Sequence, residues 1–256
     1  MPVAGQVTNP ESIETKEISY LSDGSPIAAY LARPRRPGSY PGIIVLQEIF
    51  GVNEHIRDLA RRFAAAGFVA LAPELFSRVG RPRAGEAIEE TIARAAGLDD
   101  RQLIRDVEGA VTALRNQGGV SSKIGTAGFC FGGRLALMFA CNSKSPSATV
   151  DCWGGNTLFA GPGAPTSPSR PTPVADMVGN LHGALYVVGG AEDQNPSPEH
   201  LSQLGERLKQ AGKNATVEIF QGAGHAFFAD YRPGYNEKAA FDLWPKMISF
   251  LKANLA

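Results

Sequence analysis

The order of hydrophobic and polar residues predicts that strands and helices alternate along most of the chain. Residues 17–21 and 27–31 alternate between hydrophobic and polar positions on either side of the segment 22–25, which is typical of an antiparallel hairpin. The continuous hydrophobic runs 43–46 and 68–72 indicate central strands that are covered on both faces. By their hydrophobicity, we expect further strands at residues 122–127, 148–153, 184–188 and 216–220.

Between these strands, hydrophobic residues recur at helical spacing. Strands that alternate with helices after an initial hairpin predict an α/β fold, with a mostly parallel sheet and helices on both of its faces. Polar residues that can cap a helix precede several of the predicted helices. The predicted helices begin after Asn53, at Asp99 or Asp100, at Arg134, at Ser197-Pro198 and near Asn236.

The composition is even along the chain, without a linker or an internal repeat. We therefore expect a loose N-terminal arm over residues 1–14 and a single α/β domain over residues 15–256. Residues 77–98 are irregular at their start and rich in Arg, Gly and Ala. Residues 160–173 contain five prolines, which predict a loop.

Charge and composition exclude several functions. The 256 residues contain 25 Lys and Arg against 25 Asp and Glu without a long run of either sign, which argues against nucleic acid or an acidic membrane as the main partner. No hydrophobic run approaches the roughly 20 residues that span a bilayer, and the first residues do not resemble a secretory signal. Three cysteines cannot all pair, and their spacing does not suggest a metal site. A free thiol is easiest to keep in a reducing compartment, so we expect a cytoplasmic protein.

The segment Gly128-Phe129-Cys130-Phe131-Gly132-Gly133 carries the first chemical signal. It stands between a predicted strand and a predicted helix, and Gly-x-Cys-x-Gly in that place is the layout of a nucleophile elbow with cysteine in the usual serine position. The free N–H groups and the dipole of the following helix would favour negative charge on the thiolate and on an oxyanion. The alternative is a glycine-rich turn with a structural cysteine.

Two further residues follow predicted strands and complete a candidate triad. Asp193 and His225 come after Cys130 in the order nucleophile, acid, histidine, which is the order of α/β-hydrolases. His225 would take the thiol proton and return it to the leaving group, and Asp193 would orient and stabilise the imidazole. Alternatively, Asp193 could form an Asx-type turn or a helix cap, and His225 could be a loop histidine without a role.

Four segments of the sequence together resemble the dienelactone hydrolase family over roughly residues 15–254: residues 46–51 (Leu-Gln-Glu-Ile-Phe-Gly), residues 128–133, residues 191–193 and residues 224–227. The resemblance implies an α/β-hydrolase fold with a Cys-His-Asp triad and without a cofactor or metal. It also implies that Glu48 hydrogen-bonds the resting thiol and takes its proton, whereas Glu48 alone could equally be a helix cap or a surface charge. The oxyanion hole would be formed by the backbone N–H groups of Ile49 and Phe131.

The sequence departs from the family at the binding of the substrate carboxylate. The family holds that group with two arginines, and Arg78 or Arg81 could supply the first. Ala229 occupies the second position, so Arg232 is the nearest replacement, although all three arginines could simply be solvated surface residues. Aromatic residues near the strand ends could line an apolar pocket or belong to the core; they are Phe50, Trp153, Phe159, Phe227 and Phe228.

The combined interpretation is a cysteine-dependent hydrolase of small lactones or carboxylic esters that works through a thioester acyl-enzyme. One alternative is a thiol-based esterase that acts on an unrelated neutral ester. A second alternative is a non-enzymatic binding protein on the same fold, because fold does not imply function.

Overall fold

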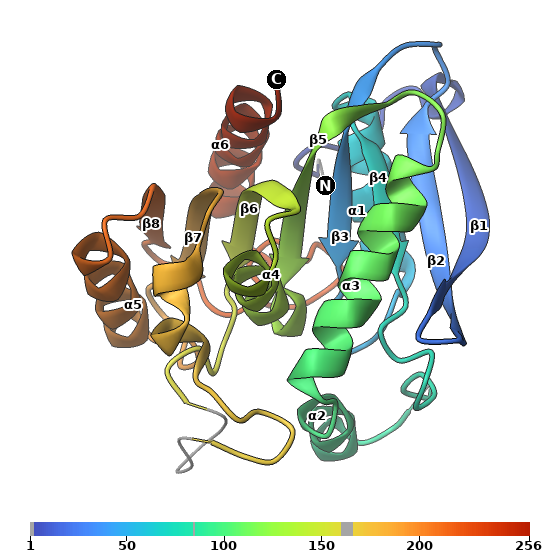
Figure 1. Cartoon of the computed structure of the whole chain (residues 1–256). Coiled ribbons are helices and arrows are strands. Elements are labelled where there is room, and N and C mark those ends of the chain that lie inside the picture. Colours follow the sequence, from blue (N-terminus) through green and yellow to red (C-terminus); the bar gives the residue numbers. More distant parts are fainter. Residues whose placement is uncertain (1–2, 84, 160–165) are drawn as a thin grey trace.

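The central element of the fold is a twisted sheet that runs through the whole molecule (Figure 1). The computed structural model describes residues 3–83, 85–159 and 166–256. Within those ranges eight strands form the sheet, and from one edge to the other they are β1 (Ile13–Ser22), β2 (Ser25–Pro34), β4 (Val69–Pro73), β3 (Tyr40–Leu46), β5 (Val120–Phe129), β6 (Pro146–Cys152), β7 (Ala184–Gly190) and β8 (Ala215–Phe220).

The pairing of the strands follows the predicted plan. β1 pairs antiparallel with β2 over the register Ile13–Pro34 to Ser22–Ser25, and β2 pairs antiparallel with β4. From β4 to β8 all neighbouring strands are parallel. The hairpin is longer than predicted, because most side chains of the edge strand β1 are exposed and its outer part therefore lacks a hydrophobic pattern.

Helices cover both faces of the sheet, as predicted. Helices α1 (Glu54–Ala65) and α6 (Glu237–Leu255) pack on one face, and α2 (Ile88–Ala96), α3 (Asp100–Arg115), α4 (Phe131–Asn142) and α5 (Pro198–Gln210) belong to the other. Four helices begin at side chains that accept a backbone N–H three residues ahead, which satisfies one of the free donors of the first turn. These N-cap residues are Asn53, Asp99, Ser197 and Asn236.

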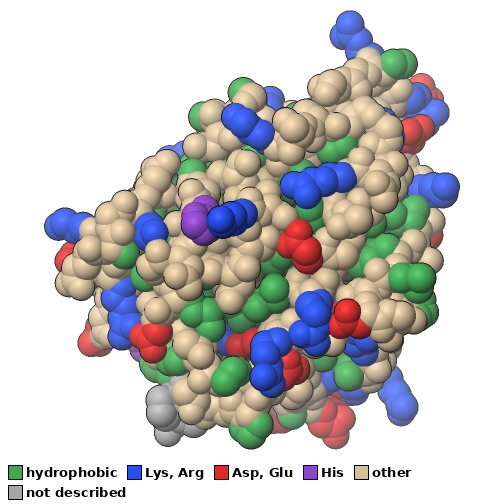
Figure 2. All heavy atoms as spheres, in the orientation of Figure 1, with side chains coloured by type: hydrophobic (Ala, Val, Ile, Leu, Met, Phe, Trp, Pro, Cys, Tyr) green, Lys and Arg blue, Asp and Glu red, His purple; other side chains and the backbone are tan. Residues whose placement is uncertain are grey.

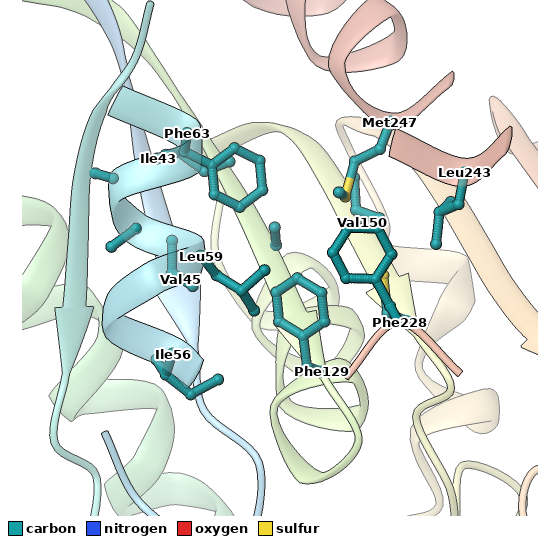
Figure 3. Packing of buried hydrophobic residues seen from close by; sticks show 14 of the residues in the cluster. Ile43, Val45, Ile56, Leu59, Phe63, Phe129, Val150, Phe228, Leu243 and Met247 are labelled. Carbon is teal, nitrogen blue, oxygen red and sulfur yellow. The ribbon is translucent and has the colours of Figure 1, made fainter. Parts of the chain in front are cut away.

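The packing between the sheet and α1 and α6 fixes the strand that leads to Cys130. Figure 3 shows Phe63 of α1, Met247 of α6 and the strand residue Phe129 gathered in one cluster of buried side chains, to which Val45 of β3 also belongs. All four side chains are completely buried. Because Phe129 directly precedes Cys130, this core holds the end of β5 in place.

The expectation of a loose arm over residues 1–14 is wrong for the residues that the structure describes. Ala4 is buried, and its carbonyl oxygen accepts a hydrogen bond of 3.0 Å from Arg62 of α1. Gly5 adopts a positive φ of 73° and lies so close to the ring of Trp244 that a Cβ atom would not fit. A short 3₁₀ turn (Pro10–Ser12) then leads into β1. The sequence did not indicate this, because small residues and backbone atoms make the contacts.

Helix α2 was not predicted from the sequence. Ile88, Ile92 and Ala95 recur at helical spacing on it, although only Thr91 and Ala95 are buried. The Arg, Gly and Ala residues around this short stripe gave residues 77–98 the composition of an irregular segment. The predicted loop 160–173 lies partly outside the described residues, and residues 166–173 contain neither helix nor strand. None of the helices in the described ranges is long and hydrophobic enough to cross a membrane.

Candidate active site

Cys130 stands at a sharp turn between β5 and α4, where the chain adopts a strained backbone conformation. Its φ of 55° and ψ of −114° lie in a region that costs a non-glycine residue on the order of 1–3 kcal/mol. The turn requires glycine on both sides: a Cβ atom on Gly128 would collide with the backbone of Gly132, and one on Gly132 with the backbone of Leu46. The Cys130 N–H donates to the Cys152 carbonyl at 2.9 Å. These contacts aim the Cys130 side chain away from the sheet.

Three side chains from three strand ends form a continuous chain of contacts. His225 Nε2 lies 3.2 Å from Cys130 Sγ, and His225 Nδ1 lies 2.7 Å from Asp193 Oδ2. Asp193 is buried, and its second oxygen, Oδ1, accepts the Asn195 N–H at 2.9 Å. Asp193 therefore makes the Asx-type turn that was the alternative interpretation and also binds the imidazole, each with a different oxygen.

The electrostatics of His225 favour its protonated form. Burial alone would lower its pKa, but hydrogen bonds to Asp193 and Cys130 outweigh that effect and raise the pKa of His225 to about 10. An imidazolium beside a sulfur stabilises the thiolate, which is the nucleophilic form of cysteine. The arrangement can therefore hold one proton between the thiol and the imidazole.

A cavity of about 460 Å³ opens next to Cys130 and His225. Ile49 and Phe131 line it beside the sulfur. Phe131 is the first residue of α4, so its backbone N–H has no acceptor within the helix. The structure thus places both residues that were predicted for an oxyanion hole at the wall of the cavity.

Glu48 is completely buried next to this cavity, with two partners from the segment after His225. Its Oε2 accepts a hydrogen bond of 3.0 Å from Tyr231, and its Oε1 lies 3.7 Å from Arg232 Nη1. Among the described residues, the Cys130 sulfur bonds to His225 instead of Glu48. A direct hydrogen bond between Glu48 and the thiol is therefore not part of this arrangement.

Two of the three arginines that were predicted to bind substrate lie outside the cavity. Arg78 pairs with Asp106 of α3 at 2.8 Å and donates to the Ser22 carbonyl, so it ties the hairpin to α3. Arg81 pairs with the buried Glu74. Arg232 does line the cavity, and its guanidinium lies 5.4 Å from the centre of the Phe50 ring.

Most of the aromatic candidates belong to the core instead of the cavity. Trp153 and Phe227, both candidates for substrate contact, are buried with their ring centres 4.9 Å apart. Phe228 is buried as well, and Phe159 packs edge-on against His200. Only Phe50 of the five lines the cavity within the described residues. A positive φ of 46° at Trp153 turns its side chain inward, which the sequence did not indicate.

The structure also reveals contributors that the sequence analysis missed. Tyr231 reaches Glu48, and two buried arginines, Arg134 and Arg170, line the inner part of the cavity. Arg134 forms a bidentate pair with Asp100, with both distances at 2.8 Å. His55 is buried, and its Nδ1 lies 3.5 Å from Asp230 Oδ1. The described residues include no group of three or more His, Cys, Asp and Glu that could hold a metal ion.

The fold and the Cys-His-Asp contacts define the class: this is an α/β-hydrolase fold. The profile of the dienelactone hydrolase family matches residues 27–255, so the chain belongs to that family. It is 35% identical over 234 residues to "Putative carboxymethylenebutenolidase" of Salmonella typhimurium, which covers 91% of this chain and 84% of that protein. A protein of the same name from Yersinia pestis is 36% identical over 93% of this chain and 88% of its own.

A solved structure agrees with this assignment. The chain superposes with a TM-score of 0.88 on the crystal structure of "Putative Dienelactone Hydrolase" from Klebsiella pneumoniae. The two are 33% identical, and the match covers 94% of this chain and 98% of the other. The resemblance inferred from the four sequence segments is therefore confirmed.

Proposed function

We propose that this protein hydrolyses small carboxylic esters or lactones with Cys130 as the nucleophile. The observation that carries the proposal is the contact chain from Cys130 through His225 to Asp193, with 3.2 Å and 2.7 Å between the paired atoms. This chain lies at the wall of a cavity large enough for a small substrate. The names of the relatives, which refer to a lactone-opening enzyme, support the same class of substrate.

In the acylation step, Cys130 Sγ attacks the ester carbonyl and forms a carbon–sulfur bond. The negative charge moves to the carbonyl oxygen, where the N–H groups of Phe131 and Ile49 would stabilise it. His225 carries the thiol proton and gives it to the leaving oxygen as the carbon–oxygen bond breaks. In a lactone, that oxygen stays attached to the acyl chain through the opened ring.

In the deacylation step, water attacks the thioester, with His225 as general base. The carbon–sulfur bond breaks, the acid leaves, and the proton returns to the Cys130–His225 pair. Asp193 keeps the imidazole in the orientation that both steps need. A Glu48 that takes the thiol proton, as the family resemblance implies, would do so beside Tyr231 and Arg232, its present partners.

A neutral ester is a second candidate substrate, and a specific observation favours it. Ala229 occupies the place of a carboxylate-binding arginine, and Arg78 and Arg81 are engaged outside the cavity. Of the three arginines predicted to bind a substrate carboxylate, Arg232 is therefore the one that lines the cavity, and it faces the carboxylate of Glu48. Hydrolysis of lactones and aryl esters, with and without a carboxylate, separates the two substrates.

Selective alkylation of the purified protein by iodoacetamide tests the nucleophile. Burial raises the pKa of Cys141 to about 12 and that of Cys152 well above the ordinary thiol value, so both should resist the reagent. Cys130 should react first, and ester hydrolysis should disappear in step with that single modification. Cys130→Ala should abolish turnover, and Cys130→Ser should be poor because a hydroxyl is far less acidic. Full activity of the alanine variant would overturn the proposal, and an inactive wild type on all substrates would favour a binding protein.

The setting of the protein is also part of the proposal. The nucleophile must stay a free thiol, and all three cysteines are free in the structure. We therefore infer that the protein works in a reducing compartment such as the cytoplasm. We propose a small molecule as its only obligatory partner, with the protein acting as a monomer or a homodimer.

A further inference from the structure

Helix α2 exposes two isoleucines at the catalytic cavity. Ile88 is 43% exposed and Ile92 is 52% exposed, and both line the same cavity as Cys130. They are four residues apart, so they lie on one face of the helix, and Ala95 and Ala96 continue that wall inward. Large hydrophobic side chains left in water at a ligand cavity indicate a surface that a ligand covers.

Contacts from outside the helix hold the C-terminal half of α2, the helix that carries these isoleucines. Arg170 donates to the Ala95 carbonyl at 3.2 Å and Ser169 donates to the Ala96 carbonyl at 3.0 Å. Arg94, also in the last turn, pairs at 2.9 Å with Glu86 ahead of the helix and donates to the Val79 carbonyl at 3.2 Å. These contacts tie the apolar wall to the segments on either side of the helix.

The wall is continuous with the reaction centre. Ile49, Phe50 and Phe131 line the cavity as well, next to Cys130. The two buried arginines of the cavity are engaged elsewhere, Arg134 with Asp100 and Arg170 with the Ala95 carbonyl. In Figure 1, α2 lies just beyond the N-terminal end of α3, at the end of the molecule to which the arrow of β3 points.

We propose that α2 binds a hydrocarbon arm of the substrate, so that the enzyme prefers esters or lactones with an alkyl or aryl substituent of several carbons. The inference rests on the proposed function, because it assigns the substrate class of that same site. The occupant is the substrate itself, since the isoleucines share their cavity with the nucleophile. Each methylene group moved from water onto this wall should raise kcat/KM by up to roughly fourfold.

Two series of esters test the inference in solution. In p-nitrophenyl esters the acyl chain grows from acetate to octanoate, and in acetate esters the chain of the alcohol grows in the same steps. For the wild type, kcat/KM should rise with chain length in at least one series. In the double variant Ile88→Gln/Ile92→Gln the rise should become flat, while p-nitrophenyl acetate is hydrolysed within about twofold of the wild-type rate. Glutamine keeps good helix propensity, so α2 should persist.

Phe241→Gln is the matched control, because Phe241 is a helical residue, 44% exposed, that does not line the cavity. It should keep the wild-type dependence on chain length. Equal loss on short and long esters in the double variant would mean that the isoleucines only stabilise α2, and would overturn the inference. An unchanged chain-length dependence, or one absent from the wild type, would overturn it as well.

A reaction that needs no hydrolysis separates this inference from the proposed function. A thiol adds to the double bond of an N-alkylmaleimide, forming a carbon–sulfur bond while its proton goes to the neighbouring carbon. The rate at which N-hexylmaleimide labels Cys130 is divided by the rate for N-methylmaleimide. The same ratio is measured for free glutathione, and dividing the first ratio by the second removes the intrinsic difference in reactivity between the two reagents. The normalised ratio reports the contribution of the wall. It should exceed one in the wild type and fall to about one in the double variant, even if no ester is hydrolysed.

The same variant and the same labelling experiment also test whether the isoleucines bind another protein chain in place of the substrate. If the isoleucines instead bind a second copy of the chain, sedimentation should show a dimer that the double variant disrupts, together with normalised maleimide ratios near one in both proteins. That result would overturn the inference.

Discussion

At the scale of single residues, the parts of the site that depend on the local sequence could be predicted, and those that depend on distant contacts could not. The turn at Cys130 needs glycines at fixed positions, so the sequence itself marks it. Asp193 and His225 could be placed because each stands a few residues after a predicted strand, in the chain order that α/β-hydrolases use. Arg78 could not, because its partner Asp106 lies on α3 and nothing near Arg78 indicates that pairing.

The contacts of His225 predict that the base and its partner act as one unit. His225→Ala and Asp193→Asn should each lower kcat by orders of magnitude, and the double variant should be little worse than the weaker single variant. The reason is that, in the proposed mechanism, Asp193 influences the reaction through the imidazole, which it contacts at 2.7 Å. Steady-state kinetics on one aryl ester would measure all three. Losses that multiply in the double variant would show that the two residues work independently.

Arg232 is predicted to lower KM for substrates that carry a carboxylate relative to neutral esters. The loss of one charge-assisted pair with a substrate carboxylate should cost about 1.5–3 kcal/mol, or roughly ten- to hundredfold in KM. Arg232→Ala should therefore raise KM for a carboxylated lactone and leave an aryl acetate nearly unaffected. Arg81→Ala is the control, because Arg81 pairs with Glu74 outside the cavity. Equal losses on both substrates would give Arg232 a structural role, and no loss on either would favour neutral esters.

At the scale of elements, the helices and strands that bury much hydrophobic surface could be predicted from the sequence, and α2, which buries little, could not. β3 and β4 are buried on both faces and appear in the sequence as uninterrupted hydrophobic runs. α2 buries only Thr91 and Ala95, and its short stripe of Ile88 and Ile92 stands in a segment rich in Arg, Gly and Ala. Its isoleucines line the cavity and not the core, so this helix contributes little of the buried surface that marks the other helices.

The connection between β5 and α4 is predicted to tolerate no side chain at Gly132. A Cβ atom there would collide with the backbone of Leu46, and backbone atoms cannot move aside as a flexible side chain can. Gly132→Ala should lower the free energy of unfolding by about 1–3 kcal/mol and also abolish turnover. Urea unfolding followed by circular dichroism measures the first effect.

Gly118→Ala is the matched control for that variant. A Cβ atom at Gly118 would have no neighbour within 4 Å, and its φ is not positive. The control should keep the wild-type unfolding midpoint and the wild-type activity. If Gly132→Ala behaves like Gly118→Ala, the elbow is less tightly packed than the close approach of β3 and α4 indicates.

At the scale of the whole molecule, charges of opposite sign lie close together both on the surface and in the interior. On the face in Figure 2, Lys and Arg side chains lie beside Asp and Glu side chains, which agrees with equal numbers of basic and acidic residues in the sequence. In the interior, most buried charges are paired, as Arg134 is with Asp100. Asp151 is an exception within the described residues, because its Oδ2 is buried without a hydrogen-bond partner and its Oδ1 accepts only the Gly154 N–H.

Burial raises the pKa of Asp151 from 3.8 to about 7 and makes the stability of the fold depend on pH. Between these two values the folded state holds a proton that the unfolded state has released. The stability that this proton provides is therefore fully present below pH 3.8 and is lost as the pH rises through about 7. A shift of this size corresponds to at most about 4 kcal/mol.

Asp151→Asn should remove this dependence, because the amide stays neutral and its oxygen can still accept the Gly154 N–H. The free energy of unfolding, measured by urea titration at intervals from pH 4 to pH 8, should fall less in the variant than in the wild type. The difference, variant minus wild type, should rise steadily up to about pH 7 and then level off. Subtracting the two curves removes the contributions of His225 and of the other titrating groups that the two proteins share. A difference that stays constant across this range would mean that Asp151 is ionised in the folded protein even at low pH.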